Sequence, residues 1–169
     1  VGGRFDRAEA RTRAMSTGIV TKQDDTARTG RVALMYNFDN GFAPYASYSP
    51  SFEPQAGTTF GGAPFKPSEG EQYEAGFKYE VPGTNAFLQA SVYQLTQSNV
   101  TTTDLAHPTF QIQTGEIGAR GVEVEARATV FDNLDLVAAY TYTDAEVTKS
   151  NGVDLGKRPP VVPRHTAAL

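Results

Sequence analysis

The 169-residue sequence contains no cysteine and no tryptophan, and it has only two histidines. Without cysteine, neither disulfides nor thiolate metal sites hold the chain together. His107 and His165 lie far apart in the sequence, with no acidic cluster at ligand spacing, and no nucleophile elbow is present. We therefore expect no catalytic residue, no metal site and no cofactor.

Two further features that the chain lacks are a long apolar run and a basic surface. No stretch approaches the ~20 apolar residues that a membrane-spanning helix requires. A net charge of -4 offers no basic footprint for nucleic acid, so no nucleic-acid partner is expected. The mean hydropathy of -0.39 still permits a membrane β-barrel, because only every second residue of its strands faces lipid.

Alternation of apolar and polar residues is the main pattern that is present. In 72–81, Tyr73, Phe77 and Tyr79 share one face while Glu74 and Lys78 share the other, as in a half-buried strand. The same reading predicts eight strands, two of them partial, and no helix. Their ranges are 1–7, 31–38, 42–49, 72–81, 86–95, 120–130, 134–143 and 164–169.

Short and long connections alternate strictly along the chain. Turn-forming residues occupy 39–41, 82–85 and 131–133, whereas long polar stretches occupy 8–30, 50–71, 96–119 and 144–163. This alternation is typical of an up-and-down outer-membrane barrel, with tight periplasmic turns at one rim and long extracellular loops at the other. The fold class predicted is all-β, an antiparallel transmembrane β-barrel segment.

Two alternatives remain open at this point. A soluble β-sandwich also alternates, but its strands cluster at ~5–6 residues and its core favours bulky aliphatic side chains over alanine and tyrosine. A small eight-stranded outer-membrane barrel, structural or adhesive, could close on itself within this length.

Several runs, in order, resemble the TonB-dependent siderophore receptors, especially the ferrichrome-receptor-like branch. The first is Phe38-Asp39-Asn40-Gly41-Phe42-Ala43-Pro44-Tyr45, which continues to position 54. The others lie at 67–79, 93–100, 113–116, 120–126, 139–147 and 156–165. The resemblance covers nearly the whole chain.

This resemblance implies a bacterial outer-membrane location, crossed many times, and a barrel of 22 strands around an N-terminal plug. Residues 1–169 would be a partial barrel domain, with the plug, the TonB-coupling segment and the C-terminal strands absent. The implied function is uptake of ferric siderophores energised through the TonB complex, by a protein that is a monomer at full length. Cobalamin, haem or a sugar are alternative substrates, and outer-membrane lipid is the surrounding partner.

Candidate ligand-binding residues are the aromatic side chains in the predicted extracellular loops, since such side chains offer rigid contact area to a bulky chelate. They are Phe52, Phe60, Phe65 and Phe110. Packing of these rings within the loops is the competing interpretation. The alternating charges are interpreted as the polar inner wall of a barrel rather than a substrate path; they are Glu74, Lys78, Glu80, Glu123, Glu125 and Arg127.

Overall fold

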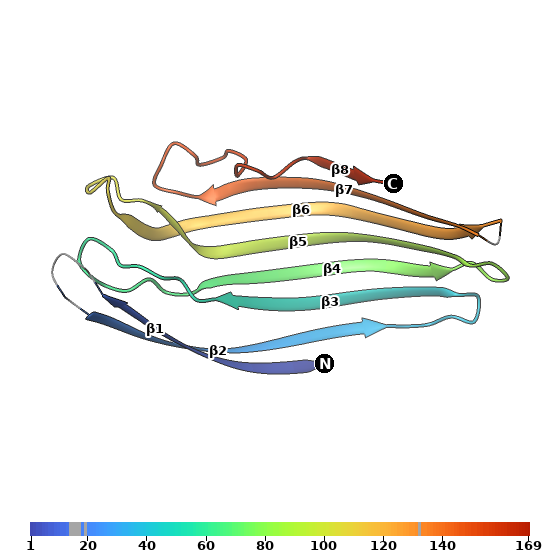
Figure 1. Cartoon of the computed structure of the whole chain (residues 1–169), viewed down its shortest axis with the longest axis horizontal. Coiled ribbons are helices and arrows are strands. Elements are labelled where there is room, and N and C mark those ends of the chain that lie inside the picture. Colours follow the sequence, from blue (N-terminus) through green and yellow to red (C-terminus); the bar gives the residue numbers. More distant parts are fainter. Residues whose placement is uncertain (14–17, 19, 132) are drawn as a thin grey trace.

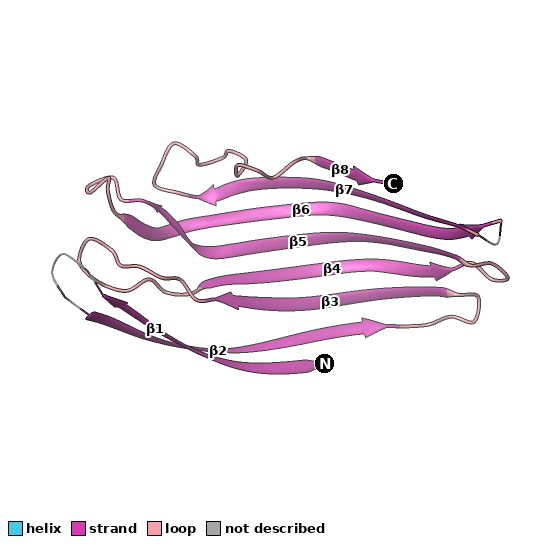
Figure 2. Ribbon diagram, viewed as in Figure 1, coloured by secondary structure: helices cyan, strands magenta, loops and turns pink. Residues whose placement is uncertain are grey.

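A computed structural model describes residues 1–13, 18, 20–131 and 133–169 of the chain. Within these ranges the fold is one antiparallel sheet whose strands follow the chain order (Figures 1 and 2). The strands are β1 (Gly2–Arg13), β2 (Val20–Met35), β3 (Phe42–Glu53), β4 (Ser68–Glu80), β5 (Ala86–Thr103), β6 (Gln111–Val130), β7 (Leu134–Lys149) and β8 (His165–Ala168). No helix in the described part is long and apolar enough to cross a membrane.

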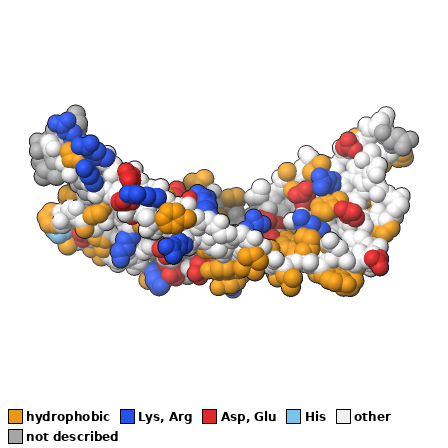
Figure 3. Space-filling model, turned by 90° about the horizontal axis from the view of Figure 1, so that it is seen from below, with side chains coloured by type: hydrophobic (Ala, Val, Ile, Leu, Met, Phe, Trp, Pro, Cys, Tyr) orange, Lys and Arg blue, Asp and Glu red, His pale blue; other side chains and the backbone are white. Residues whose placement is uncertain are grey.

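The sheet is curved, and its two faces differ in chemistry. Figure 3 shows the molecule as a crescent, with hydrophobic side chains gathered on its convex side. Cross-strand pairing places Phe77, Ala90 and Val124 in one row, and Lys78, Gln89 and Glu125 in the row beside it. Because adjacent residues of a strand point to opposite faces, these rows occupy opposite sides of the sheet.

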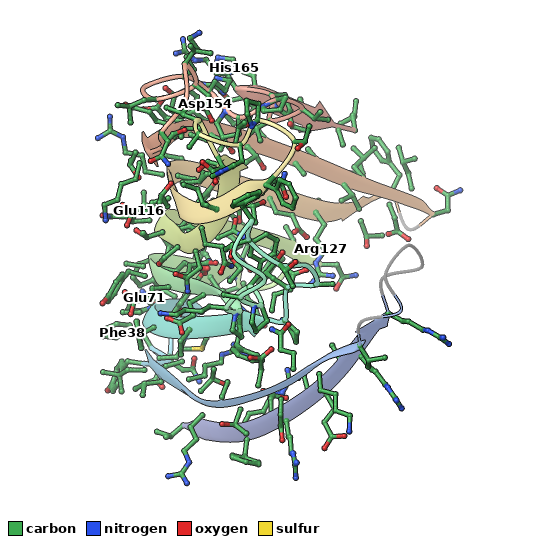
Figure 4. The ribbon with its side chains drawn as sticks, turned by 90° about the vertical axis from the view of Figure 1, so that its left-hand side faces the viewer. Phe38, Glu71, Glu116, Arg127, Asp154 and His165 are labelled. Atoms are coloured by element: carbon green, nitrogen blue, oxygen red, sulfur yellow. The ribbon has the colours of Figure 1, made fainter. Side chains whose placement is uncertain are left out.

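Figure 4 identifies the sides, since Arg127 lies on the concave side and Glu71 on the convex side. Arg127 has the same strand parity as Glu125, so the charged row faces inward and the apolar row faces outward. The charged row thus lies on the inner wall, as predicted, and the predicted fold class is confirmed.

The convex face carries an exposed apolar band. Leu34, Val92 and Leu136 expose 77%, 54% and 44% of their surface, and apolar side chains this open mark contact with another apolar phase. Aromatic pairs lie along the band, with the rings of Phe42 and Phe77 5.3 Å apart and those of Tyr48 and Tyr73 4.9 Å apart. An outward apolar band with aromatic rims is the lipid-facing surface of a transmembrane barrel.

The concave face is polar and held by side chains that reach across strands. Tyr45 Oη donates to Glu74 Oε1 at 2.6 Å, and Tyr93 Oη lies 2.9 Å from Thr143 Oγ1. Tyr93 also covers Gly121 of the paired strand, where an added Cβ would come within 2.6 Å of the phenol oxygen.

The described residues form no closed core, since none of the large side chains among them is fully buried. A β-sandwich requires a core of buried side chains between two sheets, so that alternative is wrong.

The strands extend well beyond the predicted bounds at the loop end of the sheet. The predicted loop 96–119 shrinks to 104–110, 50–71 shrinks to 54–67, 144–163 becomes 150–164, and most of 8–30 belongs to β1 and β2. Positions 14–17 and 19 of the last range lie outside the described residues. In the extensions of β4 and β5 nearly every residue is polar or glycine, so the alternation fades there, while backbone pairing continues between neighbouring strands.

Short connections lie where they were predicted, although the first is longer, 36–41 instead of 39–41, because β2 ends at Met35. The second is 81–85, and position 132 of the third lies outside the described residues. In the connection between β2 and β3, Gly41 has a φ of +83°, and the backbone oxygen of Glu80 lies where a Cβ would be placed. The backbone nitrogen of Glu80 donates to the carbonyl oxygen of Gly41 at 3.0 Å. Only glycine combines this φ with so close an approach of a neighbouring strand.

Candidate functional site

The loops opposite the short turns bring aromatic residues together from two separate connections. The β3–β4 connection, 54–67, contributes Phe60, and the β5–β6 connection, 104–110, contributes His107 and Phe110. The imidazole of His107 stacks on the Phe60 ring, with centroids 3.5 Å apart and an interplanar angle of 10°. Phe110 meets the same ring edge-on, with centroids 5.2 Å apart. We call Phe60, His107 and Phe110 the aromatic cluster.

Asp104 holds the histidine in place. Its Oδ1 accepts a hydrogen bond from the backbone nitrogen of Ala106 at 2.9 Å, and its Oδ2 accepts one from His107 Nδ1 at 3.1 Å. The hydrogen bond from His107 lowers the pKa of Asp104 below its ordinary value, and burial opposes this shift. The ionised carboxylate thus fixes both the turn and the direction of the imidazole.

The cluster is accessible, because Phe60 exposes 55% and Phe110 38% of its surface. Rings that are open to solvent yet fixed against each other offer a preformed apolar surface to a ligand. Phe60 and Phe110 therefore lie in loops, as predicted, and the structure in addition brings them together with His107.

The other two predicted ligand-binding residues lie elsewhere. Phe65 exposes only 6% of its surface and packs beneath Gly57 of its own loop, so it fits the competing interpretation of packing within the loop. Phe52 belongs to β3, where it pairs with Glu69, so its predicted position in a loop is wrong. The strand continues to Glu53 because β4 supplies backbone partners along its whole length.

The polar residues of the concave face also form a hollow. An open depression of about 350 Å³ is lined by Arg31, Ser47, Glu74 and Lys78, together with Tyr45. These residues come from three neighbouring strands, and two of them were predicted to form the inner wall. Across the described residues, no group of three or more His, Cys, Asp or Glu side chains could hold a metal ion.

Sequence reasoning missed His107 and Asp104 as parts of the site. A histidine 47 positions from its stacking partner gives no local signal, and its acidic neighbour precedes it by only three residues in a turn. His165 lies elsewhere, with its Nδ1 2.9 Å from Tyr140 Oη on the convex face.

Comparisons with known proteins cover the whole chain. Residues 1–169 match a family model described as TonB dependent receptor-like, beta-barrel. The chain is 41% identical over 169 residues to the ferrichrome outer membrane transporter/phage receptor of Escherichia coli, and 40% identical over 169 residues to the ferrioxamine B receptor of Salmonella typhimurium. These alignments take in 100% and 99% of the chain but only 22% and 24% of the relatives.

A solved structure shows the same fold. The siderophore receptor PiuA from Acinetobacter baumannii superposes with a TM-score of 0.81 over 98% of the chain at 21% identity, and 27% of that receptor is matched. The chain therefore spans about a quarter of the length of the proteins that it resembles.

Proposed function

The chain belongs to the TonB-dependent receptor β-barrel family, whose barrels lie in the bacterial outer membrane, and from this we propose that it forms part of a receptor that takes up ferric siderophores. The relatives named above, a ferrichrome transporter and a ferrioxamine B receptor, support this substrate class. Energy for uptake would come through TonB, and the chain itself would perform no chemical step.

The aromatic cluster at the loop end is the observation that carries the proposal. A ferric siderophore is a bulky chelate, and fixed, exposed rings such as Phe60 and Phe110 provide contact area at low entropic cost. The iron arrives inside the chelate, so no residue here needs to ligate it.

The rest of the chain supports the passage of the bound chelate. The apolar band anchors the sheet in outer-membrane lipid, and the concave face supplies a polar wall for a water-filled interior. In the longer, monomeric protein, further strands would close a 22-stranded barrel around a plug, and a coupling segment would reach TonB.

Uptake by the full-length receptor tests the proposal. The complete gene is expressed in a strain lacking its own siderophore receptors, and entry of ⁵⁵Fe-ferrichrome and ⁵⁵Fe-ferrioxamine B is measured with and without functional TonB. We expect saturable uptake of at least one chelate, lost without TonB. Uptake of cobalamin, haem or a sugar, with no binding of either chelate, would contradict the substrate class.

A small closed barrel is not favoured by the sheet topology. In the part of the chain that the structure describes, β1 pairs with β2 and β8 pairs with β7, and the two outer strands do not meet. The sheet is open, as expected for one section of a wider barrel.

A further inference from the structure

The side chain of Gln113 joins the β3–β4 loop to the β5–β6 hairpin. Its Oε1 accepts a hydrogen bond from the backbone nitrogen of Lys66 at 2.5 Å, and its Nε2 donates to the carbonyl oxygen of Lys66 at 2.5 Å. The same Nε2 donates to the carbonyl oxygen of Asn99 at 3.1 Å. One side-chain amide thus satisfies both backbone groups of Lys66, as a neighbouring strand would.

Asn99, on β5, makes a second hydrogen-bonded link from the hairpin to the β3–β4 loop. Its Nδ2 donates to the carbonyl oxygen of Pro67 at 2.8 Å, from a backbone with a φ of 57°. The register of β5 and β6 shifts between Gln97 and Val100, so Asn99 lies in a bulge that turns its side chain toward the loop. Asparagine tolerates this left-handed conformation better than most residues.

Ser68 continues the attachment at the start of β4. Its Oγ donates to the carbonyl oxygen of Ser98 at 3.1 Å and accepts from Gln97 Nε2 at 3.0 Å. Only 4% of Ser68 is exposed, so these bonds are shielded from water. The loop is therefore fastened to the hairpin at its base, about where it enters β4, and again at its tip through the aromatic cluster.

We propose that Gln113 is a positioning residue that fixes the loop 54–67 on the hairpin and so sets where Phe60 meets the ligand. It acts through the backbone of Lys66 and touches no ligand itself. The role rests on the proposed function, because it matters only if the aromatic cluster binds the chelate.

Replacing Gln113 with glutamate gives a near-isosteric test. A carboxylate of the same length can still accept the hydrogen bond from the backbone nitrogen of Lys66. It cannot donate to the carbonyl oxygens of Lys66 and Asn99, and its negative charge would repel them. The matched control is Gln111→Glu, two residues earlier on the same strand, with the same change of charge and no side-chain hydrogen bond described there.

Hydrogen exchange of the full-length receptor without ligand gives the first measurement. In Gln113→Glu we expect the segment 54–67 to exchange about tenfold faster than in the unsubstituted receptor, since a hydrogen-bonded joint has been lost. Gln111→Glu should exchange at the original rate. An unchanged rate in Gln113→Glu would overturn the proposal, whether or not the receptor binds siderophores.

Uptake kinetics give the second measurement, using ⁵⁵Fe-ferrichrome and ⁵⁵Fe-ferrioxamine B. A positioning role predicts that the half-saturation concentration rises about tenfold in Gln113→Glu while the maximal uptake rate per receptor in the membrane stays the same. A fall in the maximal rate alone would contradict it. If Gln113→Glu does not reach the membrane, Asn99→Gly, which keeps the positive φ but loses the bond to Pro67, should show the same pattern more weakly; normal exchange and affinity there would overturn the proposal.

Discussion

Phe60 exposes more than half of its surface and yet contacts two other aromatic rings. The His107 imidazole lies parallel to it at 3.5 Å, and the Phe110 ring lies nearly perpendicular to it at 5.2 Å between centroids. Aromatic pairs contribute ~0.5–1.5 kcal/mol beyond the area that they bury, so the two contacts hold this loop residue in one orientation. A fixed ring is a better ligand contact than a mobile one, because less freedom is lost on binding.

Truncating this ring should weaken binding of the chelate. Phe60→Ala removes both the apolar contact surface and the stack on His107, and we expect the affinity for ferrichrome or ferrioxamine B to fall about tenfold. Fluorescence titration of the full-length receptor measures this, and Phe60→Tyr is the control, since it retains the ring. Equal affinities for Phe60→Ala and the unsubstituted receptor would show that the aromatic cluster does not contact the chelate.

Acid should loosen the turn that carries His107. The pKa of Asp104 is lowered in the folded state by the hydrogen bond from His107. A lowered pKa means that the carboxylate stabilises the turn fully above its ordinary value of 3.8, and that this contribution is lost as the pH falls through the lowered value. A nitroxide at Thr109→Cys should therefore become more mobile below about pH 4.

The matched variant for this experiment is Asp104→Asn, which cannot ionise. Its nitroxide mobility should not change between pH 7 and pH 3. A pH response that persists in Asp104→Asn would assign the effect to another group.

Gly121 shows how the concave wall limits side-chain size. An added Cβ would crowd the phenol of Tyr93 and the backbone of Tyr142, whereas at Gly118 the nearest atom, Thr148 Cγ2, lies 3.2 Å away. We expect Gly121→Ala to lower the free energy of unfolding by ~1–3 kcal/mol and Gly118→Ala to lower it less. Urea titration of the refolded full-length barrel compares the two, and the opposite order would refute this packing.

The residues of the site were only partly predictable from the sequence. Phe60 and Phe110 were recognised because aromatic side chains stand out in a polar, Gly- and Pro-rich connection. Phe65 has the same local setting, and only the fold reveals that it packs under Gly57. The role of Gln113 could not be predicted from the sequence, because its partner Lys66 is 47 positions away and nothing local distinguishes it from the other polar residues.

At the scale of the strands, the side that a residue faces decides what it tolerates. Ala90 lies in the apolar outward row with Phe77 and Val124, and Gln89 lies in the inward row with Lys78 and Glu125. We expect Ala90→Lys to destabilise the full-length barrel in lipid by ~2–4 kcal/mol, because the charge enters the apolar band. Gln89→Lys adds the same charge beside one acid and one base, and should change stability far less.

Reversible unfolding in lipid bilayers measures both variants. A larger loss of stability in Gln89→Lys than in Ala90→Lys would contradict this assignment of the lipid-facing and inward-facing rows. The band itself was predictable, since lipid imposes a period of two on its outward residues. The polar extensions were not, because in water neither face of a paired strand needs to be apolar, and the sequence then looks like a loop.

For the whole molecule, the open sheet has a direct consequence. The outer edges of β1 and β8 present backbone groups that a bilayer cannot hydrate, and each unsatisfied group costs several kcal/mol. We expect the isolated 169-residue chain, refolded in detergent, to aggregate or remain an open sheet. It should show no heat-modifiable shift on a gel, and a clear shift would instead support a small closed barrel.

The extensions of β5 and β6 also hold the loop between them away from the part of the sheet that is embedded in lipid. The loop that carries His107 and Phe110 stands on these extensions, which form a stalk of two backbone-paired strands beyond the apolar band. Removing two residues from each strand of the stalk would lower this loop by ~7 Å without turning any side chain to the other face. Ligand preference can therefore diverge between receptors, or be transferred as a cassette joined within the stalk, while the part embedded in lipid is left unaltered.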